Sequence, residues 1–474
     1  MLEGLELSVL NHSELENFYD LSSEYYKKNY LELATFLRTK PYEMVDKIAY
    51  VTDGEHGSPD WDEKSNIKYI TAECIKPNYI EEIAFNTISK EQFYRNLRAS
   101  LQDDDVLIYS VGAYAGYAAK AEKHLFPASI PRSVAIVRLN DARFKPEYIS
   151  VFLNSIFGSF QTKRFRAGNS QPMLALEKIK QFQIPLLALD FQERVATLYQ
   201  SAYEARLESI STYLKSEQLL LEKVGLADFK SSNQSANIKT FAQSFGSNGR
   251  LDAEYYQPKY EVFENTIKSH HNGYTLISHE YDHFCAVSSK PKTAYNYIEI
   301  SDVNVSDGTN SPNLLETSEL PANAKYEVQK GDLIISKVRP NRGAVTVIES
   351  DADNLIVSGA FTVLREKSES VFTKEVLKVL LRTPIYREWL LQFNIGTQYP
   401  VIRDDDILNL PIPKIDIATQ ANISELVQHS FTLKAESKRL LNVAKRAVEI
   451  AIEQDEVAGL AYIKKETEAA IAAR

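Results

Sequence analysis

Two segments of the chain carry apolar and small residues at alternating spacings of three and four, which predicts two long helices. The first has these positions at Phe191, Val195, Leu198, Ala202 and Ala205, and after a stutter at Leu207, Ile210, Leu214, Leu221 and Val224. The second has them at Ile423, Leu426, Ser430, Leu433, Ser437, Leu440, Ala444, Ala447 and Ala451. Such seams favour helices that pack on each other as a coiled coil. The alternative, in which each helix packs only on its own domain, stays open.

Short apolar runs bounded by turns precede each long helix and predict β-strands. They are Asn66–Ile70, Val106–Ser110 and Val134–Val137 in the first half, and Tyr297–Ile300, Leu333–Ile335 and Phe361–Leu364 in the second. An amphipathic helix follows in each half, from Pro146 to about Phe157 and from Thr373 to about Phe393. The Ile-Pro pairs at 184–185 and 412–413 then stop local structure, because proline disfavours the helical conformation in the residue before it.

The two halves repeat one unit at an offset of about 228 residues. The tyrosine-rich opening segment Leu21–Tyr30 matches Leu251–Tyr260, and Asp105–Ser110 matches Asp332–Ser336. Two repeated loops, Gly168–Leu174 and Gly396–Ile402, also match, and the register continues without a gap to Gln192 and Gln420. The first segment, Met1 to Glu16, has no convincing counterpart. This sustained register indicates an internal duplication.

Composition changes this interpretation little. Apolar residues make up 44% and charged residues 25% of the 474 residues, as in ordinary globular proteins. No run of about 18 apolar residues predicts a membrane span, and the N-terminus lacks a signal-peptide pattern. Cys74 and Cys285 have no partner spacing, which favours a reducing, cytoplasmic protein. The net charge of −10 weighs against nucleic acid, but net charge does not report how the basic residues are distributed.

The motifs of common catalytic sites are missing from the sequence. We find no phosphate-binding Gly-rich loop, no Gly-x-Ser-x-Gly and no His-Glu-x-x-His. The carboxylate run Asp103–Asp105 is interpreted as a solvated turn, and His270–His271 as a solvated loop. For His56, a surface loop and a ligand-facing role are equally favoured. We therefore predict neither catalytic nor metal-binding residues, and no cofactor.

Taken together, these features resemble the specificity subunit of type I restriction–modification systems, over nearly the whole chain. The resemblance rests on the loop Thr52–Pro59, the two repeated loops, the Ile-Pro pairs, the glutamines that head the long helices and the segment Arg250–Tyr256. None of these motifs is specific by itself. Their order, which occurs twice along the chain, is the specific feature.

The resemblance implies an α+β fold with two mixed α/β target-recognition domains in a pseudo-two-fold tandem repeat, separated by two long antiparallel coiled-coil helices. The domains would be 1–185 and 229–413, and the spacer helices 186–228 and 414–474. It further implies a non-catalytic subunit that reads an asymmetric bipartite site in double-stranded DNA. The partners would be two modification subunits, which bind S-adenosylmethionine and flip out the target adenine, and a restriction subunit.

Basic and amide side chains on loops are the candidate DNA contacts, because they bind phosphates and read base edges. The candidates are His56, Arg132, Lys163, Arg164, Arg166, Lys290, Lys292, Lys337, Arg339, Asn341 and Arg342. In the repeated loops, Gly168, Gln171, Gly396, Gln398 and Tyr399 are expected to have a structural or backbone role, since a base-reading residue need not be repeated. Two alternatives stay open: a recognition subunit of a type II-like methyltransferase or another defence complex, and a coiled-coil scaffold that binds no DNA.

Overall fold

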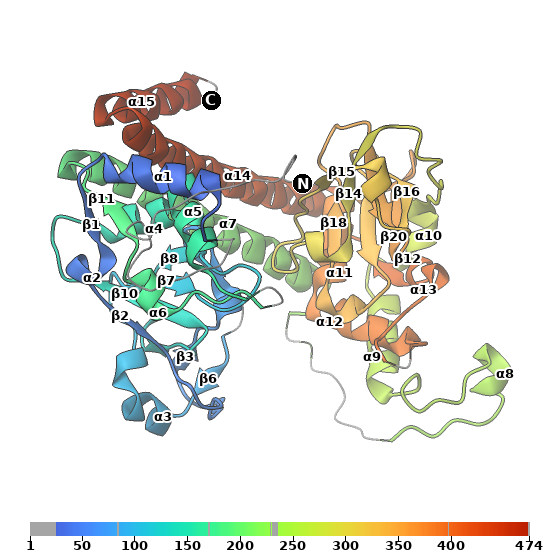
Figure 1. The fold of residues 1–474 in the computed structure, drawn as a ribbon. Helices are drawn as coiled ribbons and strands as arrows, with labels where there is room; N and C mark the ends of the chain where they lie inside the picture. Colours follow the sequence, from blue (N-terminus) through green and yellow to red (C-terminus); the bar gives the residue numbers. More distant parts are fainter. Residues whose placement is uncertain are drawn as a thin grey trace, which may run out of the picture. The chain divides into compact units, whose positions relative to one another are not determined.

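The computed structural model describes residues 25–82, 85–168, 171–227, 229, 236–396 and 398–472. The chain forms two compact units, which we call unit 1 (Met1–Arg206 and Lys434–Arg474) and unit 2 (Leu207–Leu433). This division passes through both long helices, whereas the domain limits expected from the sequence fall between helices and sheets. Each unit therefore contains one sheet-rich region and one part of each long helix (Figure 1).

The central sheet has the same antiparallel strand order in both units. In unit 1 the order is β2 (Ala49–Asp53), β10 (Val134–Leu139), β7 (Val106–Tyr109) and β8 (Ala118–Lys120). In unit 2 it is β13 (Tyr281–His283), β20 (Phe361–Glu366), β17 (Leu333–Ser336) and β18 (Val345–Val347). Five of the six apolar runs predicted as strands are confirmed, and the sixth, Tyr297–Ile300, is a strand only to Ile298 because a 3₁₀ helix begins at Ile300. Buried side chains of these strands fill the core of each unit.

Smaller sheets complete each unit. Unit 1 has β6 (Thr87–Ile88), β3 (Ile67–Tyr69) and β9 (Ala128–Ser129), and the pair β4 (Ile75–Lys76) and β5 (Tyr79–Ile80). Unit 2 has β15 (Asn313–Glu316), β14 (Ala294–Ile298), β19 (Leu355–Ser358) and β16 (Ala324–Glu327). Each Ile-Pro pair lies in a strand, β11 (Gln183–Pro185) or β21 (Pro411–Pro413), which pairs with β1 (Tyr42–Met44) or β12 (Tyr274–Leu276).

The amphipathic helix of each half is broken in two, a feature that the sequence prediction missed. Unit 1 has α4 (Pro146–Leu153) and α5 (Ile156–Phe165), and unit 2 has α11 (Lys374–Arg382), α12 (Pro384–Trp389) and a 3₁₀ turn, Leu390–Phe393. A hydroxyl stands at each break: Ser155 Oγ donates to Phe152 O at 2.6 Å, and Thr383 Oγ1 donates to Leu380 O at 2.7 Å. Hydroxyl residues favour helix starts because they bond locally to the backbone.

Apart from the three longer helices described below, the remaining helices are short. Those of eleven residues are α1 (Lys28–Arg38) and α9 (Pro258–Lys268), and the single-turn or slightly longer ones are α2 (Val45–Ile48), α3 (Lys90–Arg95), α6 (Leu176–Ile179), α8 (Phe245–Asn248), α10 (Ile277–Glu280) and α13 (Asp404–Leu408). Within the described ranges, we find no helix with the length and apolar character to cross a membrane.

The two long helices are α7 (Leu189–Lys223) and α14 (Ile417–Glu453), and they pack antiparallel. In unit 2, Ser209 Oγ donates to Ser430 O at 2.8 Å. In unit 1, Ser437 Oγ donates to Ala202 O at 2.6 Å. The contact earlier in α7 is therefore made by the residue later in α14, as antiparallel packing requires. The two bonds are also equivalent in the repeat, because Ser437 corresponds to Ser209 and Ala202 to Ser430. The predicted α+β fold with two packed helices is confirmed.

Part of the predicted seam of α7 is wrong. Leu207, Ile210 and Leu214 are exposed by 38%, 40% and 56%, whereas Tyr213 and Ser216 are buried. The buried positions keep their spacing without the predicted stutter, but several carry hydroxyl groups. Because helix carbonyls accept hydrogen bonds from the hydroxyls of Ser209 and Ser216, these polar side chains can be buried at low cost. A search for apolar residues alone therefore fails to identify the buried positions of α7 around Ser209, Tyr213 and Ser216.

The C-terminal region contains two helices rather than one. After α14 ends at Glu453, the chain turns and forms α15 (Glu456–Ala472). The carboxylate of Asp455 accepts a hydrogen bond from Ala458 N at 2.8 Å and caps the new helix. A Cβ at Gly459 would lie 2.9 Å from Ala447 O, so α15 approaches α14 where a side chain is missing. The part of the expected spacer helix 414–474 that lies in unit 1, described for residues 434–472, thus folds into a helical hairpin rather than one helix.

A buried glutamine joins each long helix to the sheet-rich region of its unit. Gln192 Nε2 donates to Arg143 O and Leu187 O at 2.9 and 2.8 Å, and its Oε1 accepts from Lys145 N at 2.9 Å. The equivalent Gln420 contacts the main-chain atoms of Val371, Ile415 and Thr373 at 2.7, 2.9 and 3.0 Å. All six main-chain partners match at the repeat offset of 228, so the two glutamines have the same structural role.

In each central sheet a buried carboxylate pairs with a partly exposed arginine. Arg138 donates to both carboxylate oxygens of Asp105, and Arg365 to both of Asp332, each bond being 2.7 Å long. These hydrogen bonds raise the pKa of both arginines. The side chain of Asp105 is fully buried, so its interpretation as a solvated turn residue is wrong. Its partner is 33 residues away and could be found only from the strand pairing.

Candidate nucleic-acid interface

The repeated loops close over the chain segment that follows the third strand of each central sheet. In unit 1, Gly112 N donates to Pro172 O and Leu174 N to Ser110 O, both at 2.8 Å. In unit 2 the equivalent bonds run from Arg339 N to Pro400 O at 2.7 Å and from Ile402 N to Lys337 O at 3.0 Å. These bonds use the backbone alone, and they favour the structural role expected for the repeated loops.

Glycine is required at the start of the second repeated loop. A Cβ at Gly396 would lie 1.9 Å from Tyr399 O. At the equivalent Gly168 the reason is different, since its φ of +89° lies in a region that side chains disfavour. Gln171 and Gln398 are both exposed in these loops.

Gly396→Ala should open the second repeated loop, because the new methyl group overlaps a carbonyl that cannot move freely. We expect a loss of about 1–3 kcal/mol, the usual cost of overpacking. Amide hydrogen exchange should accelerate at Ile395, whose N–H donates to Val401 O at 2.9 Å. Gly57→Ala is the control, since its Cβ would meet only the Glu55 side chain, at 3.4 Å. Unchanged exchange at Ile395 would contradict the assigned constraint.

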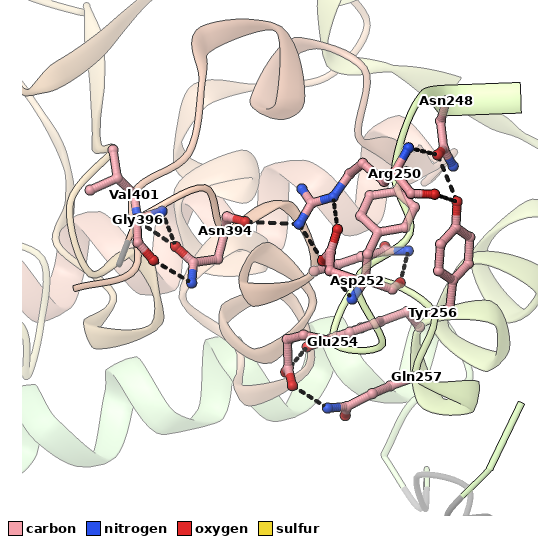
Figure 2. Close-up of polar contacts among 12 residues, drawn as sticks. Asn248, Arg250, Asp252, Glu254, Tyr256, Gln257, Asn394, Gly396 and Val401 are labelled. Carbon is pink, nitrogen blue, oxygen red and sulfur yellow. Dashed lines mark hydrogen bonds and ion pairs between the residues drawn. The ribbon is translucent and has the colours of Figure 1, made fainter. Parts of the chain in front are cut away.

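In unit 2, the segment Arg250–Tyr256 holds the second repeated loop in place (Figure 2). Asn394 Oδ1 accepts from Gly396 N and Val401 N at 2.8 and 2.9 Å, and Asn394 O accepts from the Arg250 guanidinium at 2.9 Å. Arg250 also pairs with both oxygens of Asp252 at 2.8 and 2.6 Å, which lowers the pKa of that carboxyl. The opening segment and the loop therefore form one polar network.

The repeated tyrosine pairs occupy equivalent places in the two units. Tyr25 and Tyr26 pack edge-to-face with centroids 4.8 Å apart, and Tyr255 and Tyr256 do so at 5.0 Å. Residues 21–24 of the first opening segment lie outside the described residues. Arg164 Nε donates to Tyr25 O at 3.2 Å, and its repeat equivalent Gln392 donates to Tyr255 O at 3.1 Å.

Among the basic residues of the first half, Arg164 is therefore tied to the core. Its side chain is 5% exposed, and its guanidinium lies 4.2 Å from the centre of the Tyr25 ring. This favours a structural role over a DNA contact. Lys163 is exposed and Arg166 half-buried at the end of α5. The structure thus separates a cluster that is continuous in sequence into inward and outward side chains.

In the second basic cluster, Lys337 also has an internal partner. Its ammonium group lies 3.1 Å from the Asp404 carboxylate, which accepts a hydrogen bond from Thr362 at 2.6 Å and lies 3.6 Å from His283. Burial alone would raise the pKa of Asp404, but the hydrogen bonds from Thr362 and Lys337 lower it below its ordinary value. Lys337 is therefore a weaker candidate for DNA contact than its position in the sequence indicates.

The other members of this cluster lie in a tight turn beside the second repeated loop. Arg339 has a left-handed backbone, with φ of 50°, and its guanidinium stacks 4.5 Å from the centre of the Tyr399 ring. Asn341 Oδ1 is a buried oxygen to which the structure assigns no hydrogen-bond partner. Arg342 is exposed. The structure thus brings Arg339 and Tyr399, predicted for different roles, into one contact.

Lys290 and Lys292 precede β14 in unit 2. Lys290 is half-buried with a positive φ of 54°. The ammonium of Lys292 contacts the carboxylate of Asp353 at 2.8 Å, and that carboxylate is 91% exposed. An exposed ion pair contributes little to stability, so the Lys292 side chain can exchange this partner for a phosphate at small cost.

His56 and Arg132 are brought together in unit 1. Glu55 N donates to Ile130 O, and Arg132 N donates to Glu55 O, both at 2.9 Å. The side chains of His56 and Arg132 are both exposed. The sequence analysis missed a third basic residue here, Arg98, whose guanidinium lies 3.4 Å from the carboxylate of Asp53. No cluster marks Arg98 in the sequence, and only the fold places it beside residues more than 30 positions away.

Metal binding has no candidate in the described part of the chain, where no group of three or more His, Cys, Asp or Glu side chains is placed to hold an ion.

One curated relative aligns with part of the chain. Over 112 residues the chain is 31% identical to the type I restriction enzyme HindI specificity subunit of Haemophilus influenzae, a stretch that covers 23% of this chain and 24% of that protein. The alignment thus spans about a quarter of the relative's length. No family model matches the chain.

Two solved structures of type I specificity subunits align with most of the chain. The S subunit of a type I restriction–modification system from M. genitalium is 11% identical with a TM-score of 0.43, covering 87% of this chain and 95% of that one. The HsdS subunit from Thermoanaerobacter tengcongensis is 14% identical with a TM-score of 0.29, covering 88% and 97%. Over its 112 residues, the curated match agrees with the resemblance predicted from the sequence: the chain is similar there to the specificity subunit of a type I restriction enzyme.

Proposed function

We propose that the chain is the non-catalytic DNA-specificity subunit of a type I restriction–modification complex. The observation that carries this proposal is the pair of units with one strand order and one set of repeated backbone contacts, but with different basic side chains on their loops. Repeated contacts support a common framework, and different loop side chains support two different half-sites. The partial match to a type I specificity subunit supports the same conclusion.

In this proposal, residues 1–185 and 229–413 are the recognition domains, and 186–228 and 414–474 form the spacer that sets the distance between half-sites. The candidates that contact double-stranded DNA are the exposed His56, Arg132, Lys163 and Arg342 and the half-buried Arg166, Lys290, Lys292 and Arg339. The partners are two modification subunits, which supply S-adenosylmethionine and the methyl transfer, and one restriction subunit. The complex acts in the cytoplasm, where its DNA substrate lies.

Methylome mapping of a host that carries the genes is the direct test. We expect a split, asymmetric methylated motif that disappears when this chain is deleted. The purified complex should bind a duplex with that motif, and its affinity should fall steeply as the salt concentration rises. The logarithm of the binding constant should fall against the logarithm of the salt concentration with a slope of about 0.9 for each phosphate neutralised. Unchanged methylation after deletion would contradict the proposal.

Methylome mapping combined with co-purification of the partner subunits separates the two alternatives. A recognition subunit of a type II-like methyltransferase or of another defence complex would also give a lost motif, but it would co-purify without a restriction subunit. A coiled-coil scaffold would show neither the motif nor salt-dependent DNA binding.

A further inference from the structure

The edge strand of the central sheet in unit 1 ends in a carboxylate that contacts two exposed basic side chains. Asp53, the last residue of β2, is 15% exposed at its side chain. One of its oxygens lies 2.9 Å from His56 Nε2, and the other lies 3.4 Å from the Arg98 guanidinium. The Arg98 and His56 side chains remain 51% and 56% exposed. Asp53 therefore orients both groups without covering them.

The backbone beneath this cluster is fixed. A Cβ at Gly54 would lie 1.9 Å from Ile130 O, so the chain passes here too closely for any side chain. The next residue, Glu55, is bonded through its backbone to Ile130 and Arg132. Its carboxylate accepts hydrogen bonds from Gly57 N at 3.1 Å and from Asn96 at 3.3 Å, and the bond from Gly57 lowers the pKa of this carboxyl. Arg132, His56 and Arg98 thus project from a rigid base.

Apolar side chains lie next to Arg98 in the sequence and face solvent. Tyr94 is 66% exposed and Leu97 is 57% exposed. Exposed aromatic and aliphatic groups beside fixed guanidinium groups suit a nucleic-acid surface, on which arginine binds phosphates or guanine edges and apolar groups meet bases or sugars.

Unit 2 differs at this position. The register of β13 on β20 matches that of β2 on β10 when Arg138 is aligned with Arg365, and it places Cys285 where unit 1 has Asp53. The carboxylate that orients Arg98 is therefore a feature of unit 1 alone. A contact built on it would affect one half of a bipartite site.

We propose that Arg98, Arg132 and His56 form a DNA-contact surface of unit 1, and that Asp53 is a positioning residue that holds Arg98 in its binding orientation. This inference rests on the proposed function. It adds Arg98 and Asp53 to the residues that determine recognition, and it assigns them to a single half-site.

The test uses the full complex with its modification subunits and a duplex that carries the mapped motif. Arg98→Ala should weaken binding by about 10- to 100-fold. The matched control is Lys47→Ala, which removes an exposed cation just before β2, at the opposite end of that strand from Asp53. A change in one half of the methylated motif would identify a base contact. An unchanged motif with a salt slope reduced by about 1 would identify a phosphate contact.

A double-mutant cycle tests the role of Asp53. Asp53→Asn should weaken binding in the wild-type background and have a smaller further effect when Arg98 is already alanine, because only the contact of Asp53 with His56 is then left to lose. The unfolding midpoint should stay unchanged. If Arg98→Ala bound DNA as tightly as Lys47→Ala, the proposed contact surface would be wrong. If Asp53→Asn and Arg98→Ala weakened binding independently, the positioning role of Asp53 would be wrong. In either case the wild-type complex would still bind its motif. A wild-type complex without DNA binding would instead contradict the proposed function.

Discussion

Arg365→Ala is expected to lower the free energy of unfolding of unit 2 by about 3 kcal/mol, the lower end of the cost of breaking a buried ion pair, because Asp332 is buried but the Arg365 side chain is partly exposed. Asp332 is 1% exposed at its side chain, and Arg365 donates to both of its oxygens. Without the guanidinium, the carboxylate keeps only the hydrogen bond from Gln329 N, at 2.9 Å. Urea unfolding combined with hydrogen exchange of β17 and β20 would measure the loss within this unit.

Two further variants make this result specific. The double change Asp332→Leu with Arg365→Met should recover much of the lost stability, because a buried ion pair can often be replaced by apolar side chains of similar size. Lys330→Ala removes an exposed ion pair with Asp351 and should leave unfolding unchanged. If Arg365→Ala were as stable as Lys330→Ala, the pair could not be a major support of the sheet.

Gln420→Leu should destabilise unit 2 by roughly 3 kcal/mol, since the buried carbonyl of Ile415 and the partly buried main-chain groups of Val371 and Thr373 lose their partner, and an unsatisfied buried group costs about 1–3 kcal/mol. The amide of Thr373, which donates to Gln420 Oε1 at 3.0 Å, should exchange faster with solvent. Gln192→Leu is expected to have the same effect on Lys145 in unit 1.

The matched control is Gln428→Leu, which changes an exposed glutamine on the same helix, α14. Because both variants lose an amide and gain an apolar side chain, the comparison isolates the buried hydrogen bonds. Equal unfolding free energies for Gln420→Leu and Gln428→Leu would mean that the junction does not depend on this side chain.

Local sequence patterns were sufficient for features that are themselves local. Val106–Tyr109, Val134–Leu139 and Phe361–Glu366 are strands because apolar runs between turns are recognisable without the rest of the fold. The duplication was equally visible, and it pointed to the repeated loops and to the glutamines at the heads of the helices. Their partners, however, are main-chain atoms, which no sequence pattern identifies.

Features that depend on distant partners could not be predicted. Ser209 is buried because a carbonyl of α14 accepts its hydrogen bond, and Asp105 is buried because Arg138 lies opposite it in the sheet. In the same way, Arg98 is a candidate only beside Asp53. A polar residue in sequence is read as solvated unless its partner is known, and strand register supplies that partner.

The two junction glutamines have a consequence for how new specificities can arise. Gln192 and Gln420 bind only backbone groups of the segments that they hold, at residues 143 and 145 and at 371 and 373. Any side chains are compatible with these bonds, provided that the backbone keeps its course. A foreign recognition region grafted onto these helices would therefore need matching geometry at one short segment, and its remaining surface could vary without loosening the graft.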